Sequence, residues 1–193
     1  MRVAVSQGNH RRVLCMARAE EMSMSEALPI YRTSVSPNWI DYNGHMGDYA
    51  YGIVFSDAAT AYMDRIGIDA VYRAKNNATL YTLDSRIGYL KECHAGETLQ
   101  VELALIDADH KRLHVFMRLF TADGEILALC EQLLMHVSRE GEHPRAANLP
   151  KEVRDVVLAD LRSSKSVEKP EWIDRRIGLS QIVAHETKLD YRS

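Results

Sequence analysis

The chain has 193 residues, 46% of them hydrophobic, and a formal net charge of −3. This length and composition describe one soluble globular domain with a substantial core, and two domains of ordinary size would not fit. The charge balance leaves no basic excess for nucleic acid or anionic membranes, and no run approaches the roughly 18 apolar residues of a membrane helix.

The ends of the chain differ from its middle. We expect residues 1–23 to be a mobile extension, because they carry four arginines and no apolar segment long enough for a secretory signal. Residues 24–140 should form the domain, and residues 141–193 a C-terminal helix and tail that pack on the domain or on a partner subunit. The three cysteines have no metal or redox spacing, so we expect a reducing, cytoplasmic location.

Hydrophobic periodicity predicts the first elements. Residues 29–36 alternate like a strand, and residues 48–66 repeat apolar side chains at one-turn spacing, like a helix that ends before Gly67. The inward residues of this helix should be Tyr51, Phe55, Ala58 and Tyr62. A short helix should follow at residues 70–74.

The rest of the chain changes to a period of two residues. Strands are predicted at 79–91, 98–106, 113–121 and 126–138, with an Asp-Gly turn at 122–125. The inward side chains of the two middle strands should be Leu99, Val101, Leu103, Leu105, Leu113, Val115, Met117 and Leu119. A last helix is predicted at 150–163, with these residues facing inward: Val153, Val156, Val157 and Leu161. One strand, a long helix and an antiparallel meander indicate an α+β domain.

The most informative motif surrounds Asp41, which lies three residues before Gly44 and shortly before the predicted long helix. A carboxylate that is ionised at neutral pH supplies a nucleophile or a base. The unpaired backbone N–H groups of a helix start, here near residues 47–49, can hold an oxyanion. Acyl transfer uses both groups, although an Asp in a turn is also common because its side chain bonds nearby amides.

The run D-Y-N-G-H-M at residues 41–46, followed by Tyr51 and Phe55, resembles the hot-dog-fold acyl-CoA thioesterases of the 4-hydroxybenzoyl-CoA thioesterase type. The resemblance covers about residues 30–138. It implies a curved antiparallel sheet wrapped around a long central helix, and it places Asp41 at the family's catalytic aspartate. Two positions depart from the pattern: Gly47 stands where the family has Asn, and Trp39 where many relatives have an acidic residue.

Within this family, the run W-I-D-Y-N-G-H-M especially resembles the betainyl-CoA thioesterases of carnitine breakdown. This implies hydrolysis of a small acyl-CoA thioester, betainyl-CoA to betaine and CoA, with no cofactor because coenzyme A is part of the substrate. It also implies a homodimer or homotetramer with sites at the subunit interface, and no nucleic-acid or membrane partner. Two alternatives remain. A hot-dog hydratase or dehydratase would need His45 beside an acid deep in a tunnel, and a non-catalytic acyl-CoA sensor would need a DNA-binding segment, which residues 1–28 do not show.

Further site residues are expected around Asp41. His45 could orient the substrate or Asp41, and Asp57 is a mid-helix carboxylate, where a related branch of the family has its catalytic acid; each could instead be an ordinary polar position. An aromatic box for a cationic acyl group, or alternatively interface packing, is expected from Trp39, Tyr42, Tyr49 and Tyr51. Other substrate contacts are expected from Asn43, Gly44, Met46, Gly47 and Asp48, and CoA phosphate contacts from Lys91, Lys111 and Arg112.

No metal site is expected. The fragment D-x-N-x-H at residues 41–45 is followed by Met46 and Gly52 where a calcium loop needs glycine and glutamate. Three histidines lie on strand-like segments without the geometry of a helical two-histidine site: His110, His114 and His136.

Overall fold

The computed structural model of the protein describes residues 27–164 and 172–173. The predicted extension at residues 1–23 and most of the predicted tail lie outside this part of the chain. The elements follow in this order: β1 (Leu28–Ser34), the short 3-10 helix η1 (Pro37–Trp39), α2 (Asp48–Arg65), α3 (Ala70–Asn76), β2 (Ala78–Tyr89), β3 (Thr98–Ala108), β4 (Arg112–Thr121), β5 (Ile126–Ser138), β6 (Arg145–Ala146) and α4 (Lys151–Ser163). None of the helices in the described residues has the length and apolar character needed to cross a bilayer.

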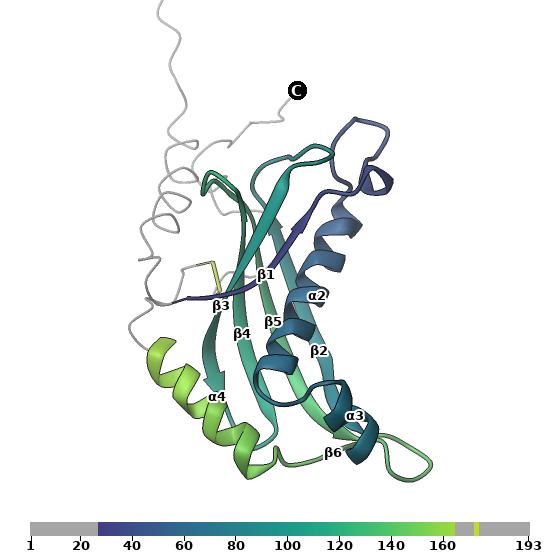
Figure 1. Ribbon diagram of the computed structural model, residues 1–193, viewed down its shortest axis with the longest axis vertical. Coiled ribbons are helices and arrows are strands. Elements are labelled where there is room, and N and C mark those ends of the chain that lie inside the picture. Colours follow the sequence, from purple (N-terminus) through teal and green to yellow (C-terminus); the bar gives the residue numbers. More distant parts are fainter. Residues whose placement is uncertain (1–26, 165–171, 174–193) are drawn as a thin grey trace, which may run out of the picture. The chain divides into compact units, whose positions relative to one another are not determined.

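The strands form one antiparallel sheet in the order β1-β3-β4-β5-β2, with β6 paired to β5. The sheet curls, and α2 lies along its concave face (Figure 1). The predicted turn between β4 and β5 is present, since Thr121 N–H donates to the Glu125 carbonyl at 2.9 Å. The arrangement is the predicted curved sheet around a long helix, and it leaves β1 and β2 as the two edge strands.

One face of the sheet packs against one face of α2. The inward positions predicted for β3 and β4 are all at most 2% exposed, and those predicted for α2 are at most 3% exposed. Burying one large apolar side chain contributes about 1.5–3 kcal/mol relative to leaving it exposed. This shared apolar face therefore fixes the position of α2, and with it the position of the loop that precedes the helix.

The helix α4 extends the same core. Its buried residues are Val153, Val157 and Asp160. Val156, predicted to face inward, is 36% exposed, so that prediction is wrong. The Asp160 carboxylate accepts hydrogen bonds from the Tyr62 hydroxyl at 3.2 Å and from Arg65 at 2.9 Å. Because a buried charge needs partners, these two α2 residues decide which face α4 turns inward, and Val156 falls at the edge of that face.

A buried histidine joins α3 to the sheet. His136 on β5 is 3% exposed; its Nδ1 lies 3.2 Å from the Ala147 carbonyl oxygen and its Nε2 lies 2.9 Å from the Tyr72 hydroxyl. A carbonyl only accepts, so Nδ1 carries the proton, and the neutral ring accepts the Tyr72 hydroxyl at Nε2. Burial lowers the pKa of His136, and backbone contacts from residues 147 and 148 offset part of this effect.

We expect His136 to make the protein less stable in mild acid. Because its folded-state pKa is lowered, the unfolded chain takes up the proton first as the pH falls through about 6.5, the ordinary value. The free energy of unfolding should therefore fall by at most about 1.4 kcal/mol per pH unit from this group, until its folded-state pKa is reached. Urea unfolding at pH 7 and at about pH 5.5 measures this loss, which should be smaller in His136→Gln. An equal loss in both proteins would contradict the assignment.

Candidate active site

Residues 41–45 form a tight turn at one end of the sheet. The Asp41 N–H donates to the His45 carbonyl at 2.8 Å, and the Gly44 N–H donates to the Asp41 carbonyl at 3.1 Å. Gly44 has a φ of +84°, in the left-handed region that other L-residues enter only at a cost. The glycine therefore permits the close return of the chain that fixes the backbone of Asp41.

The Asp41 side chain is oriented by its own turn. Its Oδ1 accepts the Asn43 N–H at 2.7 Å and the His45 N–H at 3.4 Å, and its Oδ2 accepts the Asn43 side-chain amide at 3.4 Å. This is the local bonding by which an aspartate stabilises a turn. It also holds a half-buried carboxylate in one direction, which a nucleophile or a base requires.

The start of α2 offers fewer free amides than the sequence suggests. The Gly47 N–H donates to the Trp39 carbonyl at 2.8 Å, and the Tyr49 N–H donates to the Asp48 carboxylate at 2.8 Å. Among the described residues the Asp48 N–H has no such partner. The expected group of amides at residues 47–49 is thus corrected to Asp48, because the chain folds back onto Trp39 before the helix begins.

The ring of Tyr49 explains why residue 47 is a glycine. A Cβ atom on Gly47 would lie 2.7 Å from Tyr49 Cε1, closer than real Cβ contacts occur. The Tyr49 hydroxyl donates to the Asn38 carbonyl at 3.1 Å and so anchors the ring across this position. The departure from the family's Asn is therefore a local exchange, in which an aromatic ring takes the space of the missing side chain.

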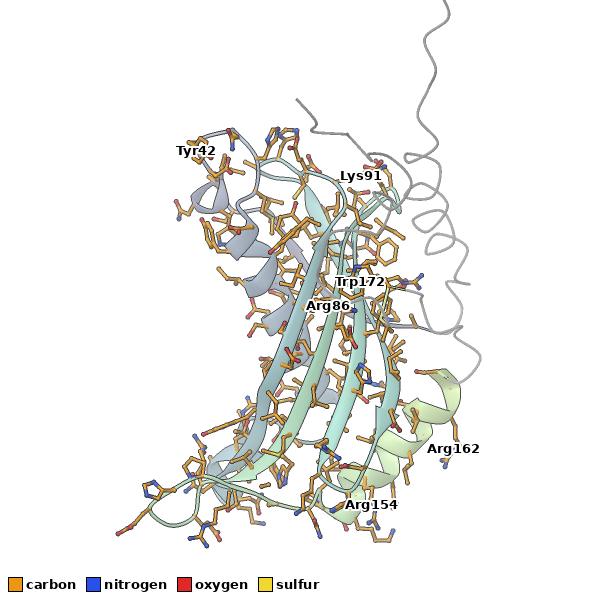
Figure 2. The ribbon with its side chains drawn as sticks, turned by 180° about the vertical axis from the view of Figure 1, so that it is seen from behind. Tyr42, Arg86, Lys91, Arg154, Arg162 and Trp172 are labelled. Carbon is orange, nitrogen blue, oxygen red and sulfur yellow. The ribbon has the colours of Figure 1, made fainter. Side chains whose placement is uncertain are left out.

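The four predicted aromatic rings do not form a box within one subunit. Tyr51 is 3% exposed, and its hydroxyl donates to the Lys91 carbonyl at 3.1 Å, while burial raises the pKa of its phenol. Tyr42, in contrast, is 96% exposed at the tip of the turn (Figure 2). The predicted box is corrected on this point, because Tyr51 falls on the core-facing side of α2.

Two exposed rings do flank the start of α2. Tyr49 is 55% exposed and Tyr89, the last residue of β2, is 51% exposed. The Tyr89 hydroxyl donates to the Asp48 carbonyl at 3.4 Å, and its ring meets Tyr51 edge-on with centroids 5.2 Å apart. Tyr89 is absent from the predicted site. The sequence does hold a signal for Tyr89. It lies at the end of the strand that follows the two helices, and the hot-dog fold brings this strand end next to the start of α2.

The second candidate acid, Asp57, lies apart from Asp41. It follows the first residue of α2 by nine positions, or about 13 Å along a helix axis. Its Oδ2 accepts the hydroxyl of Tyr31 on β1 at 3.2 Å. Asp41 and Asp57 therefore have different neighbours in the structure.

The basic residues predicted for CoA phosphates lie at opposite ends of the sheet. Lys91 lies at the same end as Tyr42 (Figure 2) and forms an ion pair with Glu125. Lys111 and Arg112 stand at the start of the 10-residue strand β4, whose far end lies about 30 Å away. Both contact the Asp109 carboxylate. The backbone N–H of Lys111 and the Arg112 side chain lower the pKa of Asp109 to about 2. Their predicted phosphate contact is thus wrong for the site of their own subunit.

His45 does not lie deep in a tunnel. Its Nε2 is 3.3 Å from Glu92 Oε2, and the Glu92 side chain is 72% exposed. The buried histidine–acid pair that a hydratase needs is therefore not supplied by His45. His114 contacts Glu131 at 2.8 Å, and in the described part of the chain no group of three or more His, Cys, Asp or Glu is arranged to hold a metal ion.

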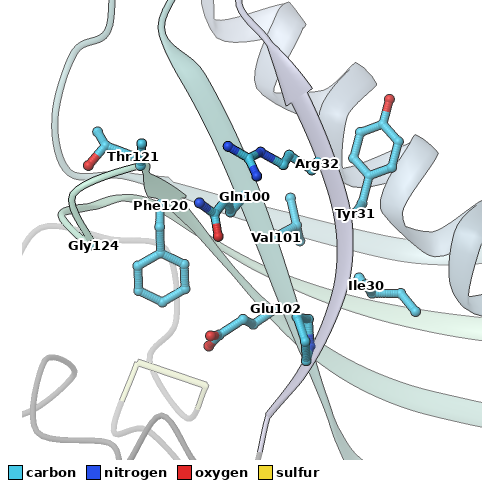
Figure 3. A pocket seen from close by; sticks show the side chains of 11 residues that line it. Ile30, Tyr31, Arg32, Gln100, Val101, Glu102, Phe120, Thr121 and Gly124 are labelled. Carbon is cyan, nitrogen blue, oxygen red and sulfur yellow. The ribbon is translucent and has the colours of Figure 1, made fainter.

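A cavity of ≈ 380 Å³ opens on the opposite face of the sheet (Figure 3). Its lining includes Arg32, Gln100, Glu102 and Phe120. Gln100 and Glu102 alternate along β3 with inward residues, so this cavity faces away from α2. None of the predicted site residues lines it, and the Asp41 turn is a separate feature.

Comparison with known proteins identifies the family. The family model of the thioesterase-like superfamily matches residues 35–177. The chain belongs to this superfamily. The match continues past residue 138, where we expected the resemblance to end, and it includes α4.

Individual relatives agree with this assignment. The chain is 39% identical over 160 residues to a betainyl-CoA thioesterase of Pseudomonas aeruginosa, covering 82% of this chain and 99% of the relative. It is 38% identical over 121 residues to an L-carnitine dehydrogenase/betainyl-CoA thioesterase of Agrobacterium fabrum, covering 63% of this chain and 25% of that protein. A solved structure of a hypothetical protein from Staphylococcus aureus in complex with CoA matches with a TM-score of 0.72 and 28% identity, covering 77% and 93% of the two chains. The predicted hot-dog fold and the predicted class, a thioester hydrolase acting on acyl-CoA, are confirmed.

Proposed function

We propose that this protein hydrolyses betainyl-CoA to betaine and CoA, as a step of carnitine breakdown. The observation that carries the proposal is the Asp41 carboxylate, which its own turn holds shortly before the unbonded Asp48 N–H at the start of α2. Similarity to a betainyl-CoA thioesterase supports the acyl group, and the L-carnitine dehydrogenase part of the second relative supports the pathway. The buried free thiols of Cys93 and Cys130 suit a cytoplasmic location.

Asp41 would act on the thioester in one of two ways. It attacks the carbonyl carbon to give an acyl-enzyme anhydride that water then cleaves, or it removes a proton from an attacking water. On either route the C–S bond breaks and water supplies the oxygen that completes the carboxylate product, while one proton of water goes to the departing CoA thiolate and the other to solvent. The Asp48 N–H, at the positive end of the α2 dipole, would hold the developing oxyanion. Water is the only other reactant, so no cofactor is needed.

A cationic acyl group suits the surroundings of this helix start. The exposed rings of Tyr49 and Tyr89 flank it, and Asp48 adds a carboxylate in the first turn. A ring face attracts a quaternary ammonium by about 0.5 to 2 kcal/mol when water is excluded. We therefore assign the preference for betainyl-CoA to these two rings, in place of the four predicted from sequence.

The substrate preference can be tested with a pair of esters. Betainyl-CoA and 3,3-dimethylbutyryl-CoA share the same branched shape and differ mainly in the positive charge. We expect a higher kcat/KM for betainyl-CoA, and each of Tyr49→Leu and Tyr89→Leu should reduce the ratio between the esters by about 2- to 30-fold. Release of the CoA thiol measures both reactions.

Tyr42→Leu is the matched control, because its ring is 96% exposed at the tip of the turn. It should leave the ratio between the esters unchanged. Equal kcat/KM values for the two esters in the wild type would reject both the preference for betainyl-CoA and the recognition of its charge by the rings. The thioester hydrolase class would survive that result, because it does not depend on the aromatic rings.

We also propose that the active protein is a homodimer or homotetramer built on the edge of β2. Residues 81–85 of this edge strand are exposed, among them Tyr81 at 39% and Leu83 at 49%. An open edge with apolar side chains is a template for further pairing. A second β2 running antiparallel would continue the sheet and use the same patch on both subunits. The other edge, β1, has 7 residues and is tied to α2 by Tyr31.

A further inference from the structure

A second histidine, His94, contacts the Asp41 turn and was not among the predicted site residues. It lies in the connection between β2 and β3, and its Nδ1 is 3.3 Å from the carbonyl oxygen of Gly44. Since a carbonyl only accepts, Nδ1 must carry the proton and donate. The backbone of His94 is itself held in place, because its main-chain N–H donates to Glu97 Oε1 at 2.9 Å.

The neighbours of His94 hold the same turn. The Met46 N–H donates to the Cys93 carbonyl at 2.9 Å, and His45 Nε2 lies 3.3 Å from Glu92 Oε2. The rings of His45 and His94 lie side by side, with centroids 4.9 Å apart. Residues 92–94 therefore contact the turn at successive points, and His94 is the contact nearest its tip.

We propose that His94 is a positioning residue that fixes the direction of the Asp41 carboxylate through the carbonyl of Gly44. This rests on the proposed role of Asp41. The Gly44 N–H donates to the Asp41 carbonyl at 3.1 Å, and the Gly44 carbonyl accepts from His94. The peptide groups before and after Gly44 are therefore both held by a hydrogen bond. The exposed turn has little packing to replace the His94 bond, and a shift of about 1 Å in a catalytic group can cost on the order of 100-fold in rate.

Three variants separate the hydrogen bond from the ring. In His94→Asn the side-chain amide nitrogen falls close to the place of Nδ1 and can still donate to Gly44. In His94→Gln the amide nitrogen falls close to the place of Nε2, and His94→Phe keeps a ring beside His45 without a donor. His94 is exposed, so all three should fold with an unchanged Tm.

We expect kcat to fall about 10-fold in His94→Gln and His94→Phe, with KM within about twofold of the wild type. His94→Asn should stay within about threefold in both constants. Amide hydrogen exchange at His45 and Met46 should accelerate several-fold in the Gln and Phe variants but not in the Asn variant. A residue with a merely structural role would not produce this separation of kcat from KM, nor the rescue by Asn.

Wild-type kcat in all three variants would overturn the inference, and so would an equal loss in all three or a loss confined to KM. The role of Asp41 is tested separately by Asp41→Asn. If that variant is inactive while the three His94 variants behave like the wild type, the present inference alone fails. If Asp41→Asn keeps full activity, the proposed role of Asp41 fails and the present inference fails with it, whatever the exchange measurements show.

Discussion

Asp41→Asn should lower kcat for thioester hydrolysis by about 100-fold or more, while leaving the Tm and the oligomeric state unchanged. The substitution keeps the shape of the side chain and an oxygen that can accept the Asn43 N–H, now 2.7 Å from Oδ1. It removes the charge, and with it the nucleophile or base. Release of the CoA thiol from betainyl-CoA measures the rate.

Asp57→Asn is the matched control, because it makes the same chemical change at the other candidate acid. An amide oxygen can still accept the Tyr31 hydroxyl, now 3.2 Å from Oδ2, so the helix should be undisturbed. We expect turnover close to that of the wild type. An active Asp41→Asn together with an inactive Asp57→Asn would move the catalytic acid to the middle of α2 and reject the mechanism proposed above.

The elements themselves could be predicted because each shows one clear period. The four long strands begin and end within about two residues of their predicted ranges, and α2 begins at Asp48 as predicted. A buried face that repeats every second residue, or at one-turn spacing, is a property of the local sequence. The position of Asp41 before the helix follows from the same local pattern.

The remaining errors arise where long-range contacts decide. Periodicity alone predicts that Val156 faces inward, but Tyr62 and Arg65 on α2 bond Asp160, so α4 buries the face that carries Asp160. The sequence places Tyr51 both on the inward face of the helix and among the site rings; its hydroxyl bonds the distant Lys91 carbonyl and the residue is 3% exposed, so only the inward position is confirmed. Tyr89 and His94 were missed because only the fold brings the connections at the end of β2 to the Asp41 turn.

Breaking the β2 edge should yield a monomer that has lost most of its activity. The double variant Tyr81→Glu/Leu83→Glu places two carboxylates on the exposed part of this strand, and pairing with a second copy would bring like charges together. Because the family resemblance implies that the site lies at the subunit interface, we expect kcat/KM to fall by about 10-fold or more. Light scattering at dilute concentration gives the mass, and thiol release gives the rate.

The matched control makes the same kind of change on α4. Val156 and Leu158 are 36% and 38% exposed there, close to the values for the β2 pair, and they lie off the sheet. Val156→Glu/Leu158→Glu should leave both the mass and the rate unchanged, since surface substitutions of this kind usually have small effects. A folded, fully active monomer in the β2 variant would show that one subunit holds a complete site. A change of mass in the α4 variant alone would place the interface at α4 instead.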